Sequence, residues 1–125
     1  MSYRPLSGQQ TLLRIFIGES DKHVGKPLFE FILEEARKMG IAGCSVFRGA
    51  MGFGAGGAIH SDFPPDYAIN LPIIVELVDT QGHVSRFLNF IEPYLQGTLV
   101  TEEKLHIHHY RHHRSGKSRK ETGDA

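Results

Sequence analysis

Residues 71–79, Leu-Pro-Ile-Ile-Val-Glu-Leu-Val-Asp, carry the strongest structural signal in the chain. Their β-branched and leucine side chains follow one another almost without a polar break. Such an apolar run is typical of a strand in the middle of a sheet, either covered on both faces or buried between subunits. Residues 71–79 are therefore expected to form a central strand.

Towards the N-terminus, the sequence predicts a strand, a helix and a second strand. Residues 11–17 alternate between two faces, as a half-buried strand does. After a break at residues 18–21, apolar side chains recur at helical spacing between Pro27, which suits the first position of a helix, and Gly40, which favours a helix end. Residues 43–48 then form the next strand.

Towards the C-terminus, the sequence predicts one more helix and one more strand. Val84, Phe87 and Ile91 share a helical face, and Pro93 ends or kinks that helix. Residues 98–110 read as the last strand.

The resulting order of elements, β-α-β-β-α-β, is the split βαβ unit of ferredoxin-like proteins. We therefore predict an α+β sandwich in which two helices cover one face of an antiparallel sheet. The other face would be uncovered in a monomer and would need a partner.

Length and composition place these elements in one small domain. The chain has 125 residues and a formal net charge of +0. We expect a flexible lead at residues 1–10, a folded domain at 11–110, and a disordered, basic, histidine-rich tail at 111–125. Cys44 is the only cysteine, so no intramolecular disulfide can form. Neither a membrane-length apolar run nor a signal segment is evident, and a cytoplasmic location is expected.

Five local strings together resemble one family. They are residues 17–21 (IGESD), 25–28 (GKPL), 35–43 (EARKMGIAG), 46–54 (VFRGAMGFG) and 71–79 (LPIIVELVD). They are similar to the PII-like proteins of domain of unknown function 190, and the resemblance extends over about residues 11–107. It implies a ferredoxin-like homotrimer, related in fold to the PII nitrogen-regulatory proteins. Such proteins bind a small ligand, typically an adenine nucleotide, in clefts between subunits, and a mobile loop reports occupancy to a regulated protein or membrane transporter.

The segment between the second and third predicted strands, residues 49–70, is a long glycine-rich loop, and loops of this length are usually functional or disordered. Residues 52–57 match the pattern G-x-G-x-x-G, but a dinucleotide-binding fold needs a helix directly behind it. Pro64 and Pro65 oppose such a helix. The glycines therefore form either a flexible hinge or a nest of backbone N–H groups that holds an anion.

We expect a small anionic ligand, with an adenine nucleotide as the first candidate, to bind where this loop meets the strand ends. The residues expected to contact it are Gly18, Glu19, Ser20, Lys26, Arg48, Gly49, Met51, Gly52, Phe53, Gly54, Gly97 and Thr98. Arg48 is the central candidate, because a guanidinium suits phosphate or carboxylate.

Some of these residues and their neighbours also have an ordinary structural interpretation. Arg48 could instead pair with a surface glutamate, and Ser20 and Asp21 could cap a helix. Met51 and Phe53 either form an exposed docking patch or pack onto the sheet or a neighbouring subunit.

The C-terminal histidines offer an alternative function. On a strand, His106 and His108 would share a face, and with His109 they could bind zinc, copper or nickel in a metal-responsive protein. No arrangement typical of a catalytic site is evident, so we expect a binding protein and not an enzyme. The tail has basic residues but few stacking aromatics, which argues against specific binding of nucleic acid.

Overall fold

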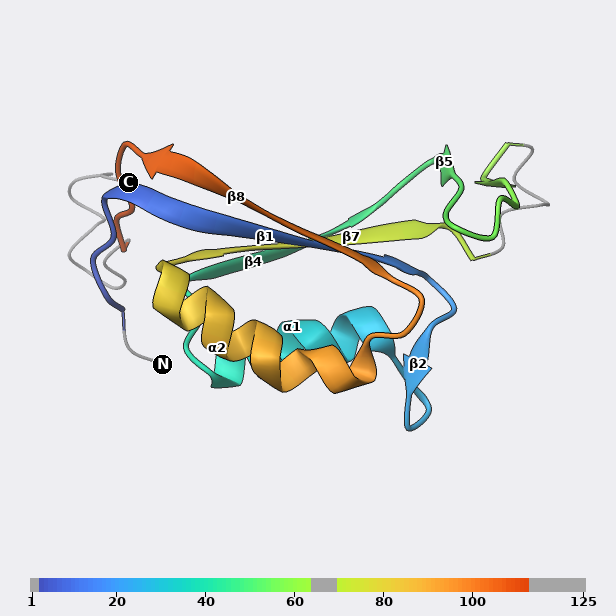
Figure 1. Ribbon diagram of the computed structural model, residues 1–125, viewed down its shortest axis with the longest axis horizontal. Coiled ribbons are helices and arrows are strands. Elements are labelled where there is room, and N and C mark those ends of the chain that lie inside the picture. Colours follow the sequence, from blue (N-terminus) through green and yellow to red (C-terminus); the bar gives the residue numbers. More distant parts are fainter. Residues whose placement is uncertain (1–2, 64–69, 113–125) are drawn as a thin grey trace, which may run out of the picture.

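The computed structural model describes residues 3–63 and 70–112 (Figure 1). Its strands are β1 (Gly8–Gly18), β2 (Lys22–His23), β3 (Lys26–Pro27), β4 (Gly43–Arg48), β5 (Met51–Gly52), β6 (His60–Ser61), β7 (Pro72–Asp79) and β8 (Leu99–Ile107). Its helices are α1 (Leu28–Lys38), α2 (Gln81–Ile91) and a short 3-10 turn at Glu92–Tyr94.

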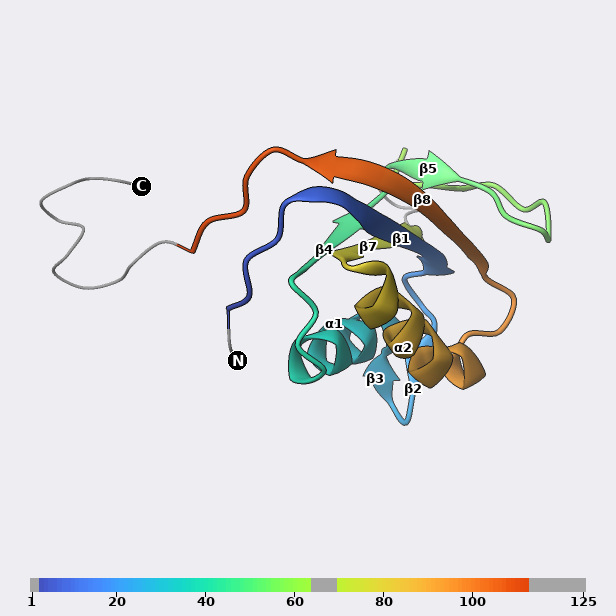
Figure 2. The same cartoon turned by 60° about the vertical axis from the view of Figure 1, so that its left-hand side comes forward.

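Four strands form one antiparallel sheet in the order β4-β7-β1-β8, and both helices pack on the same face of it (Figure 2). This is the predicted α+β ferredoxin-like arrangement. Strand β7 lies between β1 and β4, so the prediction of a central strand at residues 71–79 is confirmed. Two short hairpins, β2–β3 and β5–β6, were not predicted.

The apolar side chains of β7 point to two faces of the sheet that differ in burial. Ile73, Val75 and Leu77 are buried, whereas Ile74 and Val78 on the other side are only partly covered. No element in the described part of the chain covers that second face (Figure 2). In one subunit, therefore, β7 is not buried on both sides.

The core lies between the sheet and the two helices. It is built from one stripe on each helix and from the inward side chains of the two central strands. The residues in this cluster are Leu13, Ile15, Ile17, Leu28, Ile32, Ala36, Ile41, Ile73, Val75, Leu77, Val84, Phe87 and Ile91.

The N-terminal segment differs from the expected flexible lead. Strand β1 starts at Gly8, and Leu6 is only 6% exposed. The Arg4 guanidinium donates hydrogen bonds to both carboxylate oxygens of Asp79, with an Nη2–Oδ2 distance of 2.6 Å, and to the carbonyl of Gly40. The physical reason is that Asp79 is fully buried, and a buried carboxylate needs partners.

The buried carboxylate of Asp79 is fully paired. Besides Arg4, its carboxylate accepts hydrogen bonds from the backbone N–H groups of Ala42 and Thr80. Burial alone would raise the pKa of Asp79, but these hydrogen bonds outweigh it and hold the pKa below its ordinary value. The carboxylate thus ties the N-terminal segment to the ends of β7 and α1.

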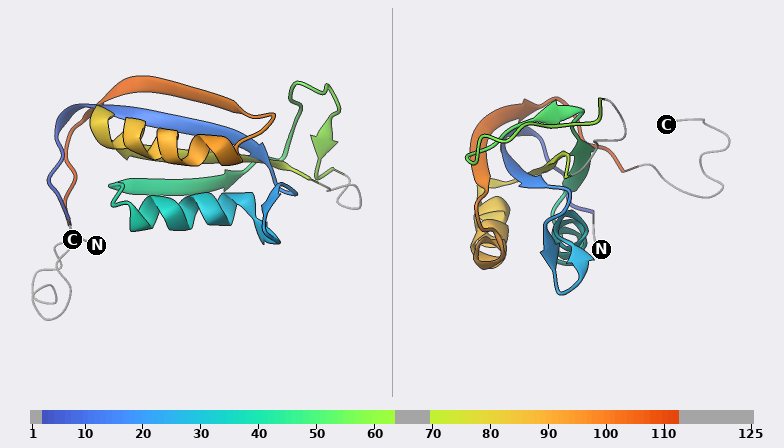
Figure 3. Two further views of the ribbon diagram at one scale, coloured as in Figure 1. Left: turned by 60° about the horizontal axis from the view of Figure 1, so that its bottom comes forward. Right: turned by 90° about the vertical axis from the view of Figure 1, so that its right-hand side faces the viewer.

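The last strand ends at Ile107, three residues before the predicted boundary at residue 110. Beyond it, the Tyr110 hydroxyl donates to the carbonyl of Ala42, and the Tyr110 ring stacks on Tyr3. The two described terminal segments lie together at one end of the sheet, and the loop after β4 lies at the other (Figure 3). Residues 113–125 of the expected tail lie outside the described part of the chain.

The predicted helix cap at Ser20 and Asp21 is wrong. The N-cap of α1 is Pro27, and no side chain caps this helix. The Asp21 carboxylate instead accepts from the N–H of Gly18, which closes the turn after β1. The β2–β3 hairpin, inserted between this turn and α1, brings the carbonyl of Asp21 and not its side chain to the N–H of Leu28 at the start of the helix.

Candidate functional site

A hollow of about 620 Å³ lies at the loop end of the sheet, where β1 and β7 meet the β5–β6 hairpin. Its wall combines strand ends, loop backbone and two aromatic side chains. The lining residues are Phe16, Ile17, Gly18, Asp21, Met51, Gly52, Phe53, Gly54, Ala55, Gly56, Gly57, Ala58, His60, Asn70, Pro72, Ile74 and Gly97. We refer to this space as the loop-end hollow.

The hollow brings together four segments of the chain, within residues 16–21, 51–60 and 70–74 and at Gly97. Of the twelve predicted contact residues, six line it: Gly18, Met51, Gly52, Phe53, Gly54 and Gly97. The strand pairing explains this, because the end of β1 lies opposite the start of β7, with Gly18 paired to Pro72. The glycine loop follows β4, the other neighbour of β7, and lies at the same end of the sheet.

Two glycines of this wall leave little room for a side chain. A Cβ atom on Gly18 would lie 2.5 Å from Oδ1 of Asn70, and one on Gly52 would lie 3.1 Å from Cγ of Pro72. Asn70 has a positive φ of 53° and accepts a hydrogen bond from the N–H of Ser20. The close approach of backbone to side chain shapes the hollow here.

The other six predicted residues lie outside the lining. Ser20 and Gly49 make backbone contacts beside it, to Asn70 and Pro72 respectively. Thr98 lines a separate hollow of about 400 Å³ near the end of α2. The remaining three, Glu19, Lys26 and Arg48, are held in ion pairs.

Lys26 lies in the β2–β3 hairpin and pairs with Glu34 of α1. Their hydrogen bond raises the pKa of Lys26 and lowers the pKa of Glu34. The ammonium group is therefore directed to the helix and not to the loop-end hollow. The sequence predicted Lys26 as a ligand contact because it lies between the first strand and the first helix. The β2–β3 hairpin, which turns its side chain away, was not predicted.

Arg48 pairs with Glu19, with an Nη2–Oε2 distance of 2.9 Å. The alternative interpretation, a surface arginine bound to a glutamate, therefore describes this subunit. The backbone on both sides is fixed to the start of β7, since Glu19 N–H donates to Leu71 and Gly49 N–H donates to Pro72. The ion pair spans the two strand ends that flank β7.

The loop-end hollow has little positive charge of its own. Among its described lining residues there is no lysine or arginine, and the titratable groups are Asp21 and His60. Phe16 and Ile74 add an apolar patch from neighbouring strands. Such a wall suits a planar apolar group and hydrogen-bonding groups, with backbone N–H groups as the source of positive potential.

Comparison with known proteins decides the family. The family DUF190, described as "Uncharacterized ACR, COG1993", matches residues 10–107. The chain belongs to this family. A UPF0166 protein of Aquifex aeolicus (strain VF5) is 33% identical over 95 residues, which is 76% of this chain and 90% of that relative. A UPF0166 protein of Methanocaldococcus jannaschii is 32% identical over 77 residues, covering 62% of this chain and 70% of the relative.

Solved structures confirm that this DUF190 protein has a PII-like fold. CPII from Thiomonas intermedia K12, a nitrogen regulatory PII-like protein solved with ADP, AMP and bicarbonate, superposes with a TM-score of 0.61 at 14% identity, covering 85% of this chain and 92% of CPII. A putative PII-like signaling protein from Thermus thermophilus gives a TM-score of 0.52 at 15% identity, covering 78% and 87% of the two chains. The family resemblance of the five strings is thus confirmed.

Several residues that line the loop-end hollow of this DUF190 protein were not predicted from the sequence. Asn70 and Pro72 belong to the site because β7 pairs with β1, a tertiary relation that local patterns do not reveal. Asp21 and His60 enter through the turn after β1 and through the β5–β6 hairpin. One signal was available for Asn70, since asparagine is favoured at positive φ where a loop returns to a strand.

Met51 and Phe53 are exposed in this subunit, at 57% and 73%. Ile59 and Phe63 on the same loop are also exposed. Within a single chain these side chains do not pack onto the sheet, so the docking-patch interpretation remains, together with packing on another subunit.

The histidines of this DUF190 protein do not form the predicted trio. His106 and His108 have ring centroids 5.1 Å apart, but β8 ends at Ile107, so the strand periodicity that would order His109 stops there. Residues 3–63 and 70–112 contain no group of three potential metal ligands. The metal-responsive alternative therefore stays a prediction without a supporting observation.

Cys44 has the environment of a structural residue. It is half-buried beside the core, and burial raises the pKa of its thiol to about 11. A thiol of this kind remains protonated near neutral pH and is a poor nucleophile.

None of the helices in the described ranges is long and apolar enough to span a membrane.

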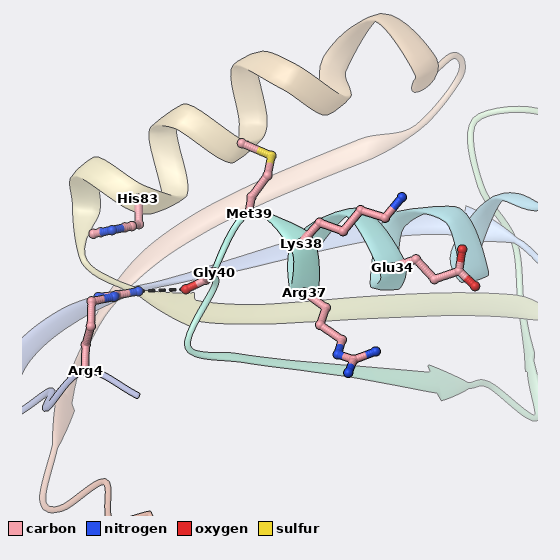
Figure 4. Close-up of a pocket in the computed structure, with 7 residues that line it drawn as sticks. All are labelled: Arg4, Glu34, Arg37, Lys38, Met39, Gly40 and His83. Carbon is pink, nitrogen blue, oxygen red and sulfur yellow. Dashed lines mark hydrogen bonds between the residues drawn. The ribbon is translucent and has the colours of Figure 1, made fainter. Parts of the chain in front are cut away.

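A second hollow, of about 700 Å³, lies at the opposite end of the protein, between the end of α1 and the start of α2 (Figure 4). It is lined by Arg4, Glu34, Arg37, Lys38, Met39, Gly40 and His83. Its charged groups do not converge: Arg4 is directed to Gly40, while Arg37 and Lys38 point away from His83 (Figure 4). We refer to it as the helix-end hollow and regard it as the weaker candidate site.

Proposed function

We propose that this protein is a PII-like regulator that binds a small anionic ligand in the loop-end hollow, with an adenine nucleotide as the first candidate. The observation that carries the proposal is the convergence of Gly18, Gly52 and Gly97, from three separate segments, on one cavity. Its volume, about 620 Å³, falls in the range of small-molecule sites. The protein acts by binding and not as an enzyme.

The chemistry of the wall supports a nucleotide. The side chains of Phe16 and Ile74 offer an apolar surface for a base, and the glycine backbone allows close approach of a polar group. Arg48, which lies outside the lining of the hollow, is kept as a predicted phosphate contact because a guanidinium suits phosphate. CPII, which shares the fold, was solved with ADP and AMP, and this makes the adenine nucleotides the first compounds to test.

The uncovered sheet face supports a homotrimer in which the ligand lies at the boundary between subunits. Phe47 and Leu99 are exposed large apolar residues, and they lie on the edge strands β4 and β8. Another copy of the chain that covered this face would bury apolar surface that water now contacts. The same packing would close the open side of the loop-end hollow.

Signalling would occur through the loop at residues 49–70, of which residues 64–69 lie outside the described part. Bound ligand would contact Met51, Gly52 and Phe53 and so fix what the loop presents. The exposed apolar side chains of Ile59 and Phe63 suit a regulated protein or membrane transporter as the partner. A cytoplasmic location is part of this proposal.

Isothermal titration calorimetry with ATP, ADP and AMP tests the ligand, and sedimentation equilibrium tests the assembly. We expect saturable binding of at least one nucleotide, with one site per chain, to a trimer. If none of the three nucleotides releases or absorbs heat with wild type, and Arg48→Ala behaves identically, the nucleotide proposal is wrong. A monomer at all protein concentrations would contradict the trimer.

A further inference from the structure

Asn70, at the point where the loop after β4 returns to β7, has a side chain that is held in one orientation. Its φ of 53° lies in the left-handed region, which asparagine tolerates better than most residues. Its Oδ1 atom accepts a hydrogen bond from the N–H of Ser20 over 2.8 Å. Because a backbone N–H can only donate, the carboxamide oxygen faces Ser20 and the Nδ2 group is the donor that remains. The orientation of this amide is therefore fixed without a ligand.

The carboxamide of Asn70 lies on the uncovered face of the sheet. Gly18 and Phe16 are two positions apart in β1, so a Cβ atom on Gly18 would point to the same face as the Phe16 side chain. That Cβ would lie 2.5 Å from Oδ1 and 3.2 Å from Nδ2 of Asn70. The amide thus lies over Gly18, on the face of the sheet that carries Phe16 and Ile74 of the loop-end hollow.

Side-chain donors are scarce in the lining of the loop-end hollow. Among the described lining residues, the side chains that carry an N–H group are Asn70 and His60, and the Asp21 carboxylate can only accept when ionised. Within residues 3–63 and 70–112, Nδ2 of Asn70 donates to no other residue. The amide therefore offers an oriented donor beside the apolar patch.

We propose that Asn70 selects the ligand of the loop-end hollow, by donating a hydrogen bond from Nδ2 to a ring nitrogen of a base that lies over Phe16 and Ile74. This inference rests on the proposed function and names a residue that determines its specificity. A molecule of similar shape without an acceptor at this point leaves the amide unpaired, and the site rejects it for that reason.

The neutral amide suits the base of a nucleotide more than its phosphates. Phosphate oxygens form their strongest hydrogen bonds with charged donors, and the described lining contains no lysine or arginine. The ring nitrogens of adenine are uncharged acceptors, and asparagine is a common hydrogen-bonding partner of adenine in protein–DNA complexes. A donor that is already oriented loses little conformational freedom when the base binds.

Calorimetric titration of ADP tests the proposal on wild type, Asn70→Asp, Asn70→Gly and Asn89→Asp. Asn70→Asp keeps an oxygen for the Ser20 N–H and tolerates a positive φ, but the ionised side chain has no donor. Asn70→Gly also tolerates the backbone conformation and adds no charge, but it lacks both amide atoms. Asn89 is the other asparagine of the chain, exposed on α2 outside the lining, so Asn89→Asp is the matched control for the added charge.

We expect Asn70→Asp and Asn70→Gly each to bind ADP about three- to tenfold more weakly than wild type, the range for the loss of one hydrogen bond. Asn89→Asp should match wild type. A loss in Asn70→Asp alone would indicate charge repulsion, and a loss in Asn70→Gly alone would indicate that Asn70 acts only by anchoring Ser20. Either result overturns the proposal.

Nuclear magnetic resonance of the side-chain amide groups reports on the donor itself. The signals of the Asn70 amide are identified by their absence in Asn70→Gly. At saturating ADP these signals should shift, while those of Asn89 stay in place. Unchanged Asn70 side-chain signals in the presence of bound ADP would contradict a hydrogen bond from Nδ2.

Failure of this inference can be told apart from failure of the proposed function. If wild type and both Asn70 variants bind ADP equally well, the role of Asn70 is wrong and the nucleotide site stands. If ADP binds to none of the four proteins, both are wrong. Thermal unfolding of each variant, followed by circular dichroism, confirms that all four compared proteins are folded.

Discussion

The two ends of this protein treat their polar groups in opposite ways. At the helix end, Asp79 is fully buried, yet Arg4, Ala42 and Thr80 satisfy its carboxylate. At the loop end, Oδ1 of Asp62 is buried without a hydrogen-bond partner, and Met51 and Phe53 are exposed. A closed network adds stability, whereas unpaired polar atoms and exposed apolar side chains leave interactions available to a ligand or partner.

The largest effect expected from this comparison concerns two aspartates. Asp79→Ala should lower the free energy of unfolding by about 2–4 kcal/mol, because it leaves two backbone N–H groups and Arg4 without their acceptor. Asp62→Ala should not lower it, because its buried oxygen makes no hydrogen bond and its removal takes away a desolvation cost. Urea unfolding measures both. Equal losses at the two positions would contradict the contrast between the ends.

Acid should weaken the helix end through the same carboxylate. Since the pKa of Asp79 is lowered in the folded protein, its stabilising contribution is complete above the unfolded pKa of about 3.9 and disappears as the pH falls through the lower folded value. The difference in urea midpoint between wild type and Asp79→Asn should therefore be smaller at about pH 3 than at neutral pH. If the gap between them is the same at both pH values, Asp79 is not the group that titrates.

At the loop end, adding a single methyl group to Gly18 should lower both the stability and the ADP affinity of the protein. Gly18→Ala places a Cβ 2.5 Å from Asn70, so we expect a loss of about 1–3 kcal/mol from local overpacking. ADP affinity should fall as well, because Asn70 lines the hollow. Gly43→Ala, where nothing lies within 4 Å of the added atom, is the matched control and should leave binding unchanged. Similar ADP affinities for the two variants would exclude Gly18 from the site wall.

The smallest effects should come from the surface ion pairs. Arg48→Ala should change the free energy of unfolding by less than about 0.5 kcal/mol, because the pair with Glu19 is solvent-exposed. It should nevertheless weaken ADP binding. Lys26→Ala, which breaks a comparable exposed pair with Glu34, should leave ADP binding unaltered. A loss of binding on replacing Lys26 would restore it as a ligand contact.

The fold could be predicted because its signals are local. The apolar run at residues 71–79, the helical stripe that ends at Gly40 and the stripe of α2 each reflect neighbours along the chain. Parts of the site could be predicted for the same reason, since a strand end next to glycines marks Gly18 and Gly52 without knowledge of the packing.

The remaining features depend on contacts between distant residues. Arg4 and Asp79 are 75 positions apart, so nothing local indicated that the N-terminal segment is anchored. Asn70 meets Ser20 only because β1 pairs with β7. Lys26 was assigned to the site on its sequence position alone, and the short β2–β3 hairpin directs it to Glu34.

The most direct test of the account is to map ADP onto the backbone amides by nuclear magnetic resonance. If the loop end is the binding end, ADP should shift the amide signals of Gly18, Gly52, Gly54 and Gly97, which line the loop-end hollow. The signals of Gly40 and His83, in the helix-end hollow, should stay in place. Shifts confined to Gly40 and His83 would contradict the assignment of ligand binding to the loop end.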